Sequence, residues 1–553
     1  MQRPVLGVNR RHRLRFGARH ALAVAIVAAC VPLGVATAAT VKADASAAAK
    51  DTLVVGVSAL PVTLDSMFAP GQESVEIITN LLEPLYQYKK KPAAGGLRSA
   101  DIGTGDKGLA GALAVKTDVS ADGKTYTLHL RQGAKSAEGN EFTSADVKWI
   151  MDRAFGTKAV GAFVASIAHI AKPTDVVVVD KYTVRITLST ANPIFFRSLQ
   201  LHPVAPYDST AAKAHATKSD PWATDWMKRN APGFGAYSVS EFTPGQQVVL
   251  KANPNYYGAK PAFGTVIYRE IPDSSQRLSL LKQGQIDIAE NLLARELKSL
   301  DGTKQKVVSV LANQLIFVAL GTKSGPTANA FVRQALQYAV PVNDIVKTVF
   351  EGNAKPLRNL VPSGYPVFDP SGWTYALNLA KAKALLAKGG FASGFDIPLL
   401  VNADVPEHAD AAVLLRDSFA KIGVKVSIDR RPSAAYLEQA NSGKIGMVMH
   451  QGYSIVTDIP YHYKLYVSGP TGFLSFGGYT NPRFDQTIAK ALDTPEGPAR
   501  SVLVRAMQKI VQADLPTLSL VEVPTRYGVS ASIKGYTWYP DNQILFADLS
   551  RIG

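Results

Sequence analysis

The spacing of apolar residues changes several times along the chain, and it predicts both strands and helices. Residues 53–57 (LVVGV) form a short β-branched run of the kind found in buried strands. Residues 73–86 place apolar side chains three and four positions apart, which predicts a helix. Alternating apolar positions around an Asp-Gly pair predict a hairpin at residues 119–131, and a second hairpin is predicted at residues 176–188.

Helical spacing recurs through the rest of the chain. A helix at residues 145–155 is expected to begin after Thr143 or Ser144, because both are good N-cap residues. Further helices are predicted at residues 344–350, 377–387, 411–422, 481–492 and 497–513. Strand pairs alternate with these helices without the strict strand–helix–strand rhythm of a Rossmann domain, so the predicted fold class is α/β.

The N-terminus has the pattern of a signal peptide. An arginine-rich stretch without acidic residues precedes an apolar run at residues 21–39, and residues 36–38 (ATA) match an A-x-A cleavage site. A membrane anchor is the alternative, but Pro32 and Gly34 interrupt a run that is short for a span of about 20 apolar residues. We therefore predict that residues 1–38 are removed and that the mature protein is periplasmic.

Two features of this leader suggest other export routes. Cys30 follows Val-Ala-Ala and fits a bacterial lipobox, in which the cysteine would carry a lipid anchor, although the chain stays apolar after it. The Arg10-Arg11 pair loosely resembles a twin-arginine signal. Because Cys30 is the only cysteine, cleavage after residue 38 would leave a mature chain without a disulfide or a reactive thiol.

Charge and composition argue against a nucleic-acid-binding protein and against a membrane-spanning mature chain. The formal net charge is +16, and about +10 remains when the six arginines of the leader are removed. Residues 89–91 are the only tight basic run, and no basic helix is interleaved with aromatic residues, so a nucleic-acid partner is not expected. After the leader, no uncharged stretch approaches membrane-spanning length, which predicts a soluble mature protein with enough chain for two or three domains.

Short catalytic motifs are absent from the sequence. It contains no HExxH, CxxC, Walker phosphate loop or GxSxG elbow. Seven histidines follow the leader, and only His450 and His462 are near each other, at a spacing that is not a helical i, i+4 pair. Scattered histidines are usually surface or packed residues, so neither a metal, nor a cofactor, nor an enzymatic activity is predicted.

Residues 233–261 (GFGAYSVSEFTPGQQVVLKANPNYYGAKP) have a distinctive pattern of turn, strand, hairpin and cap. This string resembles the signature of the large extracellular solute-binding proteins of ABC importers, the family (family 5) of oligopeptide-, dipeptide- and nickel-binding proteins. Five other segments match the family in order, among them TYTLHLRQGAKSAEGNEFTSADVKWIMDRAF and GGYTNPRFDQTIAKAL. Together the matching segments run from about residue 53 to residue 551.

The resemblance implies a two-lobed periplasmic-binding-protein fold with an extra subdomain in the first lobe and two hinge strands. The first lobe would comprise residues 40–80, 201–313 and 515–553. The extra subdomain would comprise residues 81–200, and the second lobe residues 314–514. The hinge strands are expected near residues 315–320 and 518–523, which are apolar enough to cross a buried interface.

The resemblance also implies a function. The chain would capture a small solute, with a peptide as the expected class, in the cleft between the lobes and deliver it to ABC permease subunits in the inner membrane, as a monomer. Other cargoes of the same fold remain open, namely a metal chelate, an opine, a sugar or an amine. An exported hydrolase or transferase and a sensor or chaperone subunit are further alternatives.

Asp458 is the residue expected to bind the amine of a peptide. In the family, an aspartate that follows an aromatic residue on a loop of the second lobe often has this role, and the matching stretch here is residues 452–460. It departs from the family pattern, because Tyr453 replaces a usual tryptophan and two extra residues precede the aspartate. The alternative is that Asp458 only caps a turn before Pro460.

Four further residues are expected to line the cleft. Phe68 and Gln72 follow the first strand, and Phe163 lies where the extra subdomain can overhang the cargo, unless it is a core aromatic residue. Glu522 lies within an apolar hinge segment, where a carboxylate needs a partner; either the cargo or Arg526 could provide it.

Overall fold

The protein is described by a computed structural model that covers residues 51–552 except 70–71, 103–104, 445, 455 and 470–473. The predicted leader, its cleavage site, Cys30 and residues 40–50 of the predicted first lobe lie outside the described residues. Within the described part, no helix is both long and apolar enough to cross a membrane.

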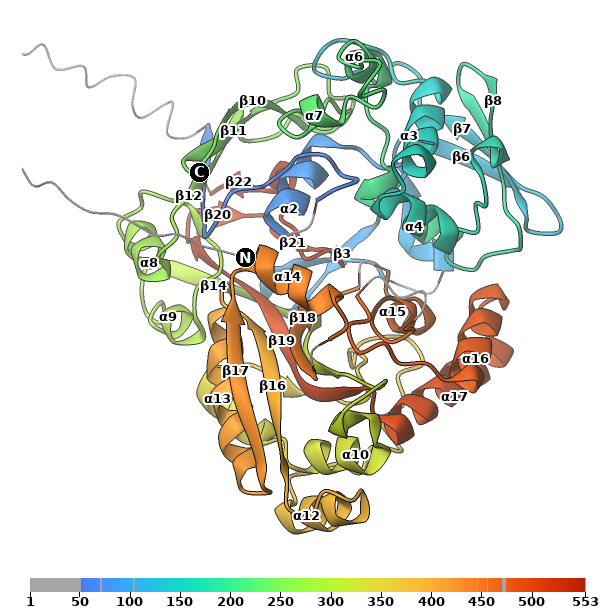
Figure 1. Ribbon diagram of the computed structural model, residues 1–553. Helices are drawn as coiled ribbons and strands as arrows, with labels where there is room; N and C mark the ends of the chain where they lie inside the picture. Colours follow the sequence, from blue (N-terminus) through green and yellow to red (C-terminus); the bar gives the residue numbers. More distant parts are fainter. Residues whose placement is uncertain are drawn as a thin grey trace, which may run out of the picture. The chain divides into compact units, whose positions relative to one another are not determined.

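One large mixed sheet organises the chain (Figure 1). Along the sheet the strands are β10 (Tyr237–Thr243), β11 (Gln247–Ala252), β12 (Thr265–Glu270), β1 (Thr52–Val57), β13 (Ile288–Ala289), β19 (Thr517–Ser530), β14 (Gln305–Leu320), β18 (Met447–Gly452), β16 (Phe395–Asn402) and β17 (Val424–Arg431). The short β15 (Lys355–Pro356) pairs with β19. The outer strands at one end come from the first half of the chain, and those at the other end come from the second.

The long strands β14 and β19 lie side by side in the middle of this sheet, between β13 and β18. They pair antiparallel, with Val308 opposite Tyr527 beside β13 and Leu315 opposite Glu522 beside β18. A register shift between residues 310 and 314 separates the two paired stretches. Both segments predicted from the sequence as hinge strands therefore lie in this central pair.

Helices cover the β16–β18 end of the sheet and enclose a separate core. They are α10 (Ala330–Tyr338), α12 (Leu379–Lys388) and α13 (Pro406–Ala420), whereas α14 (Ser433–Asn441) contacts β16 and β17 but buries Tyr436 and Ala440 in the larger core. Leu336, Leu415 and Phe419 of these helices pack with Val318 and Leu399 of the strands. The helices predicted at residues 377–387 and 411–422 are present as α12 and α13. α13 begins earlier than predicted, at Pro406, because proline fits the first turn of a helix.

At the other end, α2 (Gln72–Leu81) packs beside β10 in the larger core. The helix predicted to continue to residue 86 ends at Leu81 instead. Pro84 lacks a backbone N–H and disfavours helical geometry at residue 83, and Gly235 donates its backbone N–H to the Leu81 carbonyl (2.9 Å). A Cβ at Gly235 would lie 2.5 Å from that carbonyl oxygen, so the close approach requires glycine.

A second, four-stranded sheet is built from hairpins within residues 114–187. Its strands are β6 (Ala114–Val119), β7 (Thr125–Leu130), β9 (Thr183–Thr187) and β8 (Val176–Asp180), and α3 (Ser144–Thr157) and α4 (Val160–Ile167) accompany it. Both predicted hairpins are present. Thr143 caps α3 as predicted, with its backbone N–H donating to the Asp146 carboxylate at 2.8 Å.

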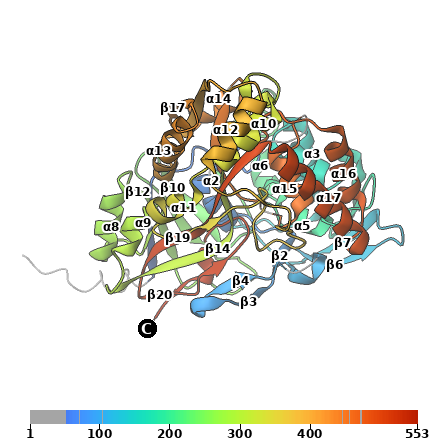
Figure 2. The ribbon, with the colours of Figure 1, turned by 90° about the horizontal axis from the view of Figure 1, so that it is seen from below.

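The remaining elements connect these parts. They include α8 (Ser274–Lys282), α9 (Ala294–Lys298), α15 (Ile459–Tyr466), α16 (Pro482–Asp493) and α17 (Pro498–Asp514). Both ribbon views place α16 and α17 on the same side of the large sheet as the four-stranded sheet (Figures 1 and 2). The C-terminal segment returns to the first half of the chain, because β21 (Thr537–Trp538) pairs with β4 (Arg98–Ala100).

Candidate functional site

Three distant segments meet beside the hinge strands: the start of α2, the loop after β18, and the loop at residues 540–543. Asn313 holds two of them together, because its side-chain amide donates to the carbonyls of Ser454 (3.1 Å) and Pro540 (2.6 Å). Asn542 in turn donates to the Asn313 side-chain oxygen at 2.9 Å. Asn313 is 1% exposed, so these bonds form inside the protein.

Tyr453 connects this junction to α2. The charges of Asp541 and Glu73 raise the pKa of its hydroxyl, and the Gln543 and Gln72 side chains lower it, which places all four residues near the Tyr453 ring. Burial is the main cause that raises the pKa of Tyr453, so the hydroxyl keeps its proton at neutral pH. The structure thus brings together two of the residues predicted from the sequence, Tyr453 and Gln72.

Acidic side chains are concentrated on the α2 side of this junction. Glu76 and Glu290 are 3% and 7% exposed, and each has one carboxylate oxygen that accepts no hydrogen bond from a donor within the described residues, although the two carboxyl groups interact with each other. Burial raises the pKa of Glu76 well above its usual range and the pKa of Glu290 to about 7, and the charge of Glu290 also raises that of Glu76. Burial likewise raises the pKa of Asp541 to about 6. The pair Glu76–Glu290 therefore holds a proton near neutral pH.

Asp458 lies in a different environment. Its carboxylate is 4% exposed, forms an ion pair with Arg500 (2.8 Å), and accepts the backbone N–H of Tyr461 (3.0 Å) as the N-cap of α15. Burial alone would raise the pKa of Asp458, but the charges of Arg500 and Arg197 outweigh it and hold the pKa below its ordinary value. The capping alternative is present, and amine binding by Asp458 stays a prediction.

Glu522 finds its partner in Ser363. The carboxylate accepts the Ser363 backbone N–H (2.7 Å) and hydroxyl (2.8 Å), and Glu522 is 4% exposed. Burial raises its pKa. Arg526, considered from the sequence as a partner for Glu522, lies 3.6 Å from Glu407 instead. Whether cargo also reaches Glu522 stays a prediction.

The other predicted residues are more dispersed. Phe68 is 44% exposed on the loop after β1, and Phe163 of α4 is partly buried against the main core. His450 is packed against aromatic rings, and burial lowers its pKa to about 4. Among the described residues, no group of three or more histidine, cysteine, aspartate or glutamate side chains is arranged to hold a metal ion.

Side-chain pairs also join the four-stranded-sheet region to the helices of the second half of the chain. Arg197 forms an ion pair with Glu496, and the Thr190 hydroxyl donates to Asp493 at 3.1 Å. On another side, Lys298 of α9 lies 3.2 Å from Glu351. Unlike the continuous strands β14 and β19, these contacts can break without disturbing a hydrogen-bonded ladder.

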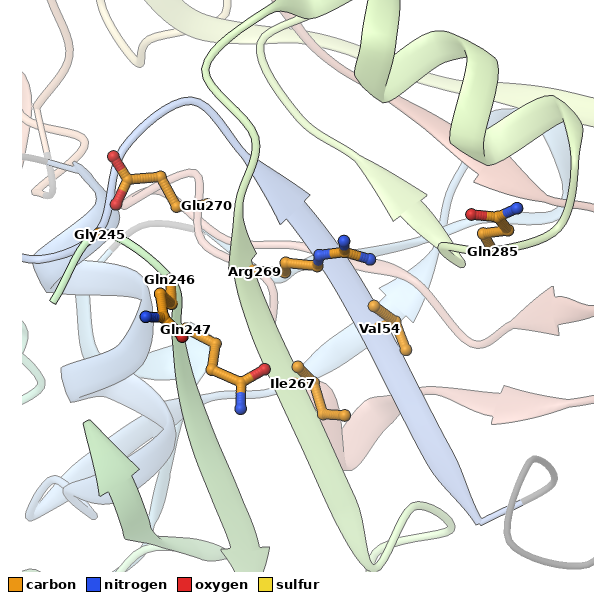
Figure 3. A pocket seen from close by; sticks show the side chains of 8 residues that line it. All are labelled: Val54, Gly245, Gln246, Gln247, Ile267, Arg269, Glu270 and Gln285. Carbon is orange, nitrogen blue, oxygen red and sulfur yellow. The ribbon is translucent and has the colours of Figure 1, made fainter. Parts of the chain in front are cut away.

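An open hollow of about 530 Å³ lies elsewhere, over β1, β12 and the β10–β11 turn (Figure 3). In it, Arg269 extends from β12 toward β1 near Val54, flanked by Ile267 and Gln247. None of the residues predicted from the sequence as cleft residues lines it. It is separate from the junction around Tyr453.

The signals for Asn313, Gln543 and Asp541 were weak in the sequence. The string YPDNQILF at residues 539–546 does contain four consecutive turn-forming or polar residues between aromatic positions. Its contact with residues 313 and 453, far away in the chain, cannot be read from local spacing.

Known proteins resemble this chain along most of its length. The chain is 26% identical to a probable D,D-dipeptide-binding periplasmic protein of Escherichia coli K12 over 506 residues, covering 90% of this chain and 93% of the relative. It is 24% identical to heme-binding protein A of Haemophilus influenzae over 555 residues, covering 96% and 98%.

A solved structure shows the same fold. The ABC transporter-associated periplasmic binding protein DppA from Helicobacter pylori, in complex with peptide STSA, superposes with a TM-score of 0.79 at 23% identity, covering 90% of this chain and 98% of that one. The prediction of a two-lobed α/β periplasmic-binding-protein fold is confirmed. The model of the bacterial extracellular solute-binding proteins, family 5 (middle), matches residues 108–473. The chain belongs to this family of bacterial extracellular solute-binding proteins.

Proposed function

We propose that this chain is the solute-binding component of an ABC importer, working in the periplasm as a monomer and passing its cargo to a membrane permease. Its cargo is a small solute, with a peptide as the expected class. Family membership supports the solute-binding role, and the names of the two relatives, one for a D,D-dipeptide and one for heme, indicate how widely cargo differs between similar chains.

We assign the lobes as the sequence predicts. Residues 40–80, 201–313 and 515–553 form the first lobe, residues 81–200 its extra subdomain, and residues 314–514 the second lobe. The observation that carries the proposal is the pair of long strands β14 and β19, which join the strands of the first half of the chain to those of the second half; ion pairs such as Arg197–Glu496 and Lys298–Glu351 also link the proposed lobes. Such an arrangement permits rocking about the strand pair.

The cargo binds at the junction of Tyr453, Gln72 and Gln543, where both lobes contribute side chains. An extended peptide carries N–H and C=O groups. Each of these groups costs roughly 2–7 kcal/mol if it is desolvated without a hydrogen-bond partner. Closure supplies such partners and excludes water. Binding and release, without chemical change of the cargo, then follow from opening and closing.

A thermal-shift screen with short peptides, amino-acid derivatives and metal chelates tests the proposal. A true cargo at a hundred times its Kd stabilises the folded chain by about 2.7 kcal/mol. Small-angle scattering should show a smaller radius of gyration with the same compound. Mass spectrometry should recover the compound unchanged, and a chemically converted compound would show that the chain is an enzyme.

A further inference from the structure

We propose that His169, Thr190 and Asp493 form an acid-sensitive latch, in which protonation of the His169 ring holds the extra subdomain against the second lobe and favours the closed form. The inference rests on the lobe assignment of the proposed function, because residues 81–200 and 314–514 must move relative to each other. It adds a dependence on pH to capture and release, and it assigns no cargo.

The latch is built from three distant segments. His169 follows α4, Thr190 follows β9, and Asp493 is the last residue of α16. The Thr190 hydroxyl donates to a carboxylate oxygen of Asp493 at 3.1 Å and lies 2.8 Å from the Nδ1 atom of His169. The Nε2 atom of the same ring lies 3.8 Å from that carboxylate oxygen. One ring nitrogen therefore faces the hydroxyl, and the other faces the carboxylate.

These contacts determine where the neutral ring carries its proton. An ionised carboxylate only accepts hydrogen bonds, so Thr190 uses its single hydroxyl proton for Asp493. The Thr190 oxygen then accepts from the ring, which requires the ring proton on Nδ1. Because a neutral imidazole has one N–H, its Nε2 atom faces the carboxylate with a lone pair, and this contact is repulsive. Protonation of Nε2 converts the same contact into an ion pair.

The charges around Asp493 also favour a cation at this position. Asp493 ends α16, where its negative side chain meets the negative end of the helix dipole. The neighbouring pair of Arg197 and Glu496 is already complete. The other charged residues of the segments that meet here are Lys172, Asp175 and Lys490. Within the described part of the chain, none of these three forms an ion pair, so His169 is the cation that Asp493 faces.

The backbone fixes the position of the His169 ring. Its φ is +61°, in the left-handed region that residues other than glycine rarely adopt. Two hydrogen bonds maintain this conformation: His169 donates its backbone N–H to the Ser166 carbonyl (3.1 Å), and Ser189 donates its own to the His169 carbonyl (2.9 Å). Such strained residues are concentrated at switch regions and ligand clamps. The side chains of His169 and Asp493 are 13% and 53% exposed, so protons reach the pair from solvent.

The pH range of the latch follows from the chemistry of histidine. Histidine side chains change charge between about pH 5 and pH 8. At the upper end of this range the Thr190 hydroxyl alone joins the ring to Asp493, and at the lower end the ion pair is added. An ion pair near the surface shifts an equilibrium by about two- to fivefold. Cargo is then held more firmly in acid, because the binding-competent closed form is more populated.

Single-molecule FRET on the exported full-length chain, without cargo, tests the latch. The chain has no cysteine after residue 30, so dyes on Thr187→Cys and Gln486→Cys, both exposed, report the distance between the subdomain and α16. The test variants are His169→Gln and Asp493→Asn. The control is His129→Gln, which removes a histidine–aspartate pair (2.7 Å) within the four-stranded sheet instead. Melting temperatures check that every variant folds.

We expect the ratio of closed to open chains to rise about two- to fivefold from pH 7.5 to pH 5.5 in the parent and in the control, but not in either test variant. Burial raises the pKa of Glu83 and Glu290 to about 7 and that of Asp541 to about 6. These groups titrate in the same range but are present in every variant, so only the difference between parent and test variants counts.

No change with pH in the parent, or the same change in His169→Gln as in the parent, would overturn the latch. Either result leaves the solute-binding function intact, because the measurement contains no cargo. That function fails separately, if no compound of the thermal-shift screen binds.

Discussion

The ion pair between Asp458 and Arg500 gives the sharpest test of how this chain uses its buried charges. Both residues are largely buried, and Arg500 also donates to the Ala491 carbonyl at 2.9 Å. Replacing Asp458 by asparagine keeps a good N-cap for α15 but leaves the arginine charge uncompensated. Removing one partner of a buried pair costs about 3–5 kcal/mol.

The size of this effect can be measured as a melting temperature. With about 2.1 cal/mol/K of unfolding entropy per residue over roughly 500 residues, a loss of 3–5 kcal/mol lowers the Tm by about 3–5 °C. Asp458→Ala also loses the cap and should fall by about one further kcal/mol. Calorimetry and urea unfolding at neutral pH would measure both variants.

A double variant completes the cycle. Asp458→Asn with Arg500→Met removes both charges, so it should recover about 2 kcal/mol or more relative to Asp458→Asn alone. The pKa of Asp458 is depressed, so the folded state gains stability from its charge above the ordinary carboxyl pKa near 4 and loses that stability as pH falls through the lower folded value. A variant Asp458→Asn that is as stable as the parent but no longer binds amines would refute the structural role.

Two further outcomes are expected. Glu496→Gln should weaken cargo binding by about two- to tenfold at low salt and less at high salt, since it removes a contact of Arg197 between the lobes; an equal effect at both salt concentrations would argue against an electrostatic contact. Gly235→Ala should destabilise the chain by about 3 kcal/mol or more in urea unfolding, because its Cβ would meet the Leu81 carbonyl oxygen at 2.5 Å, whereas Gly245→Ala, with open space but a φ of +71°, should cost only about 1 kcal/mol.

Local patterns in the sequence were sufficient for most elements. The hairpins at residues 119–131 and 176–188 were recognisable because turn residues separate alternating apolar positions. The C-terminal end of α2 was missed, since apolar spacing continues to residue 86 while the proline at position 84 and the approach of Gly235 end the helix. The spacing of apolar residues identifies the buried face of a helix. The residue at which the helix ends also depends on backbone groups of distant segments, such as the N–H of Gly235.

The site was only partly accessible from the sequence for a related reason. The resemblance to family 5 directed attention to Tyr453 and Gln72, and the structure places Gln72 close enough to affect the pKa of Tyr453. It could not reveal that Ser363 satisfies Glu522, a contact across 159 residues. Partners of buried polar groups are set by tertiary packing, and a loop with two extra residues has no fixed register in a sequence comparison.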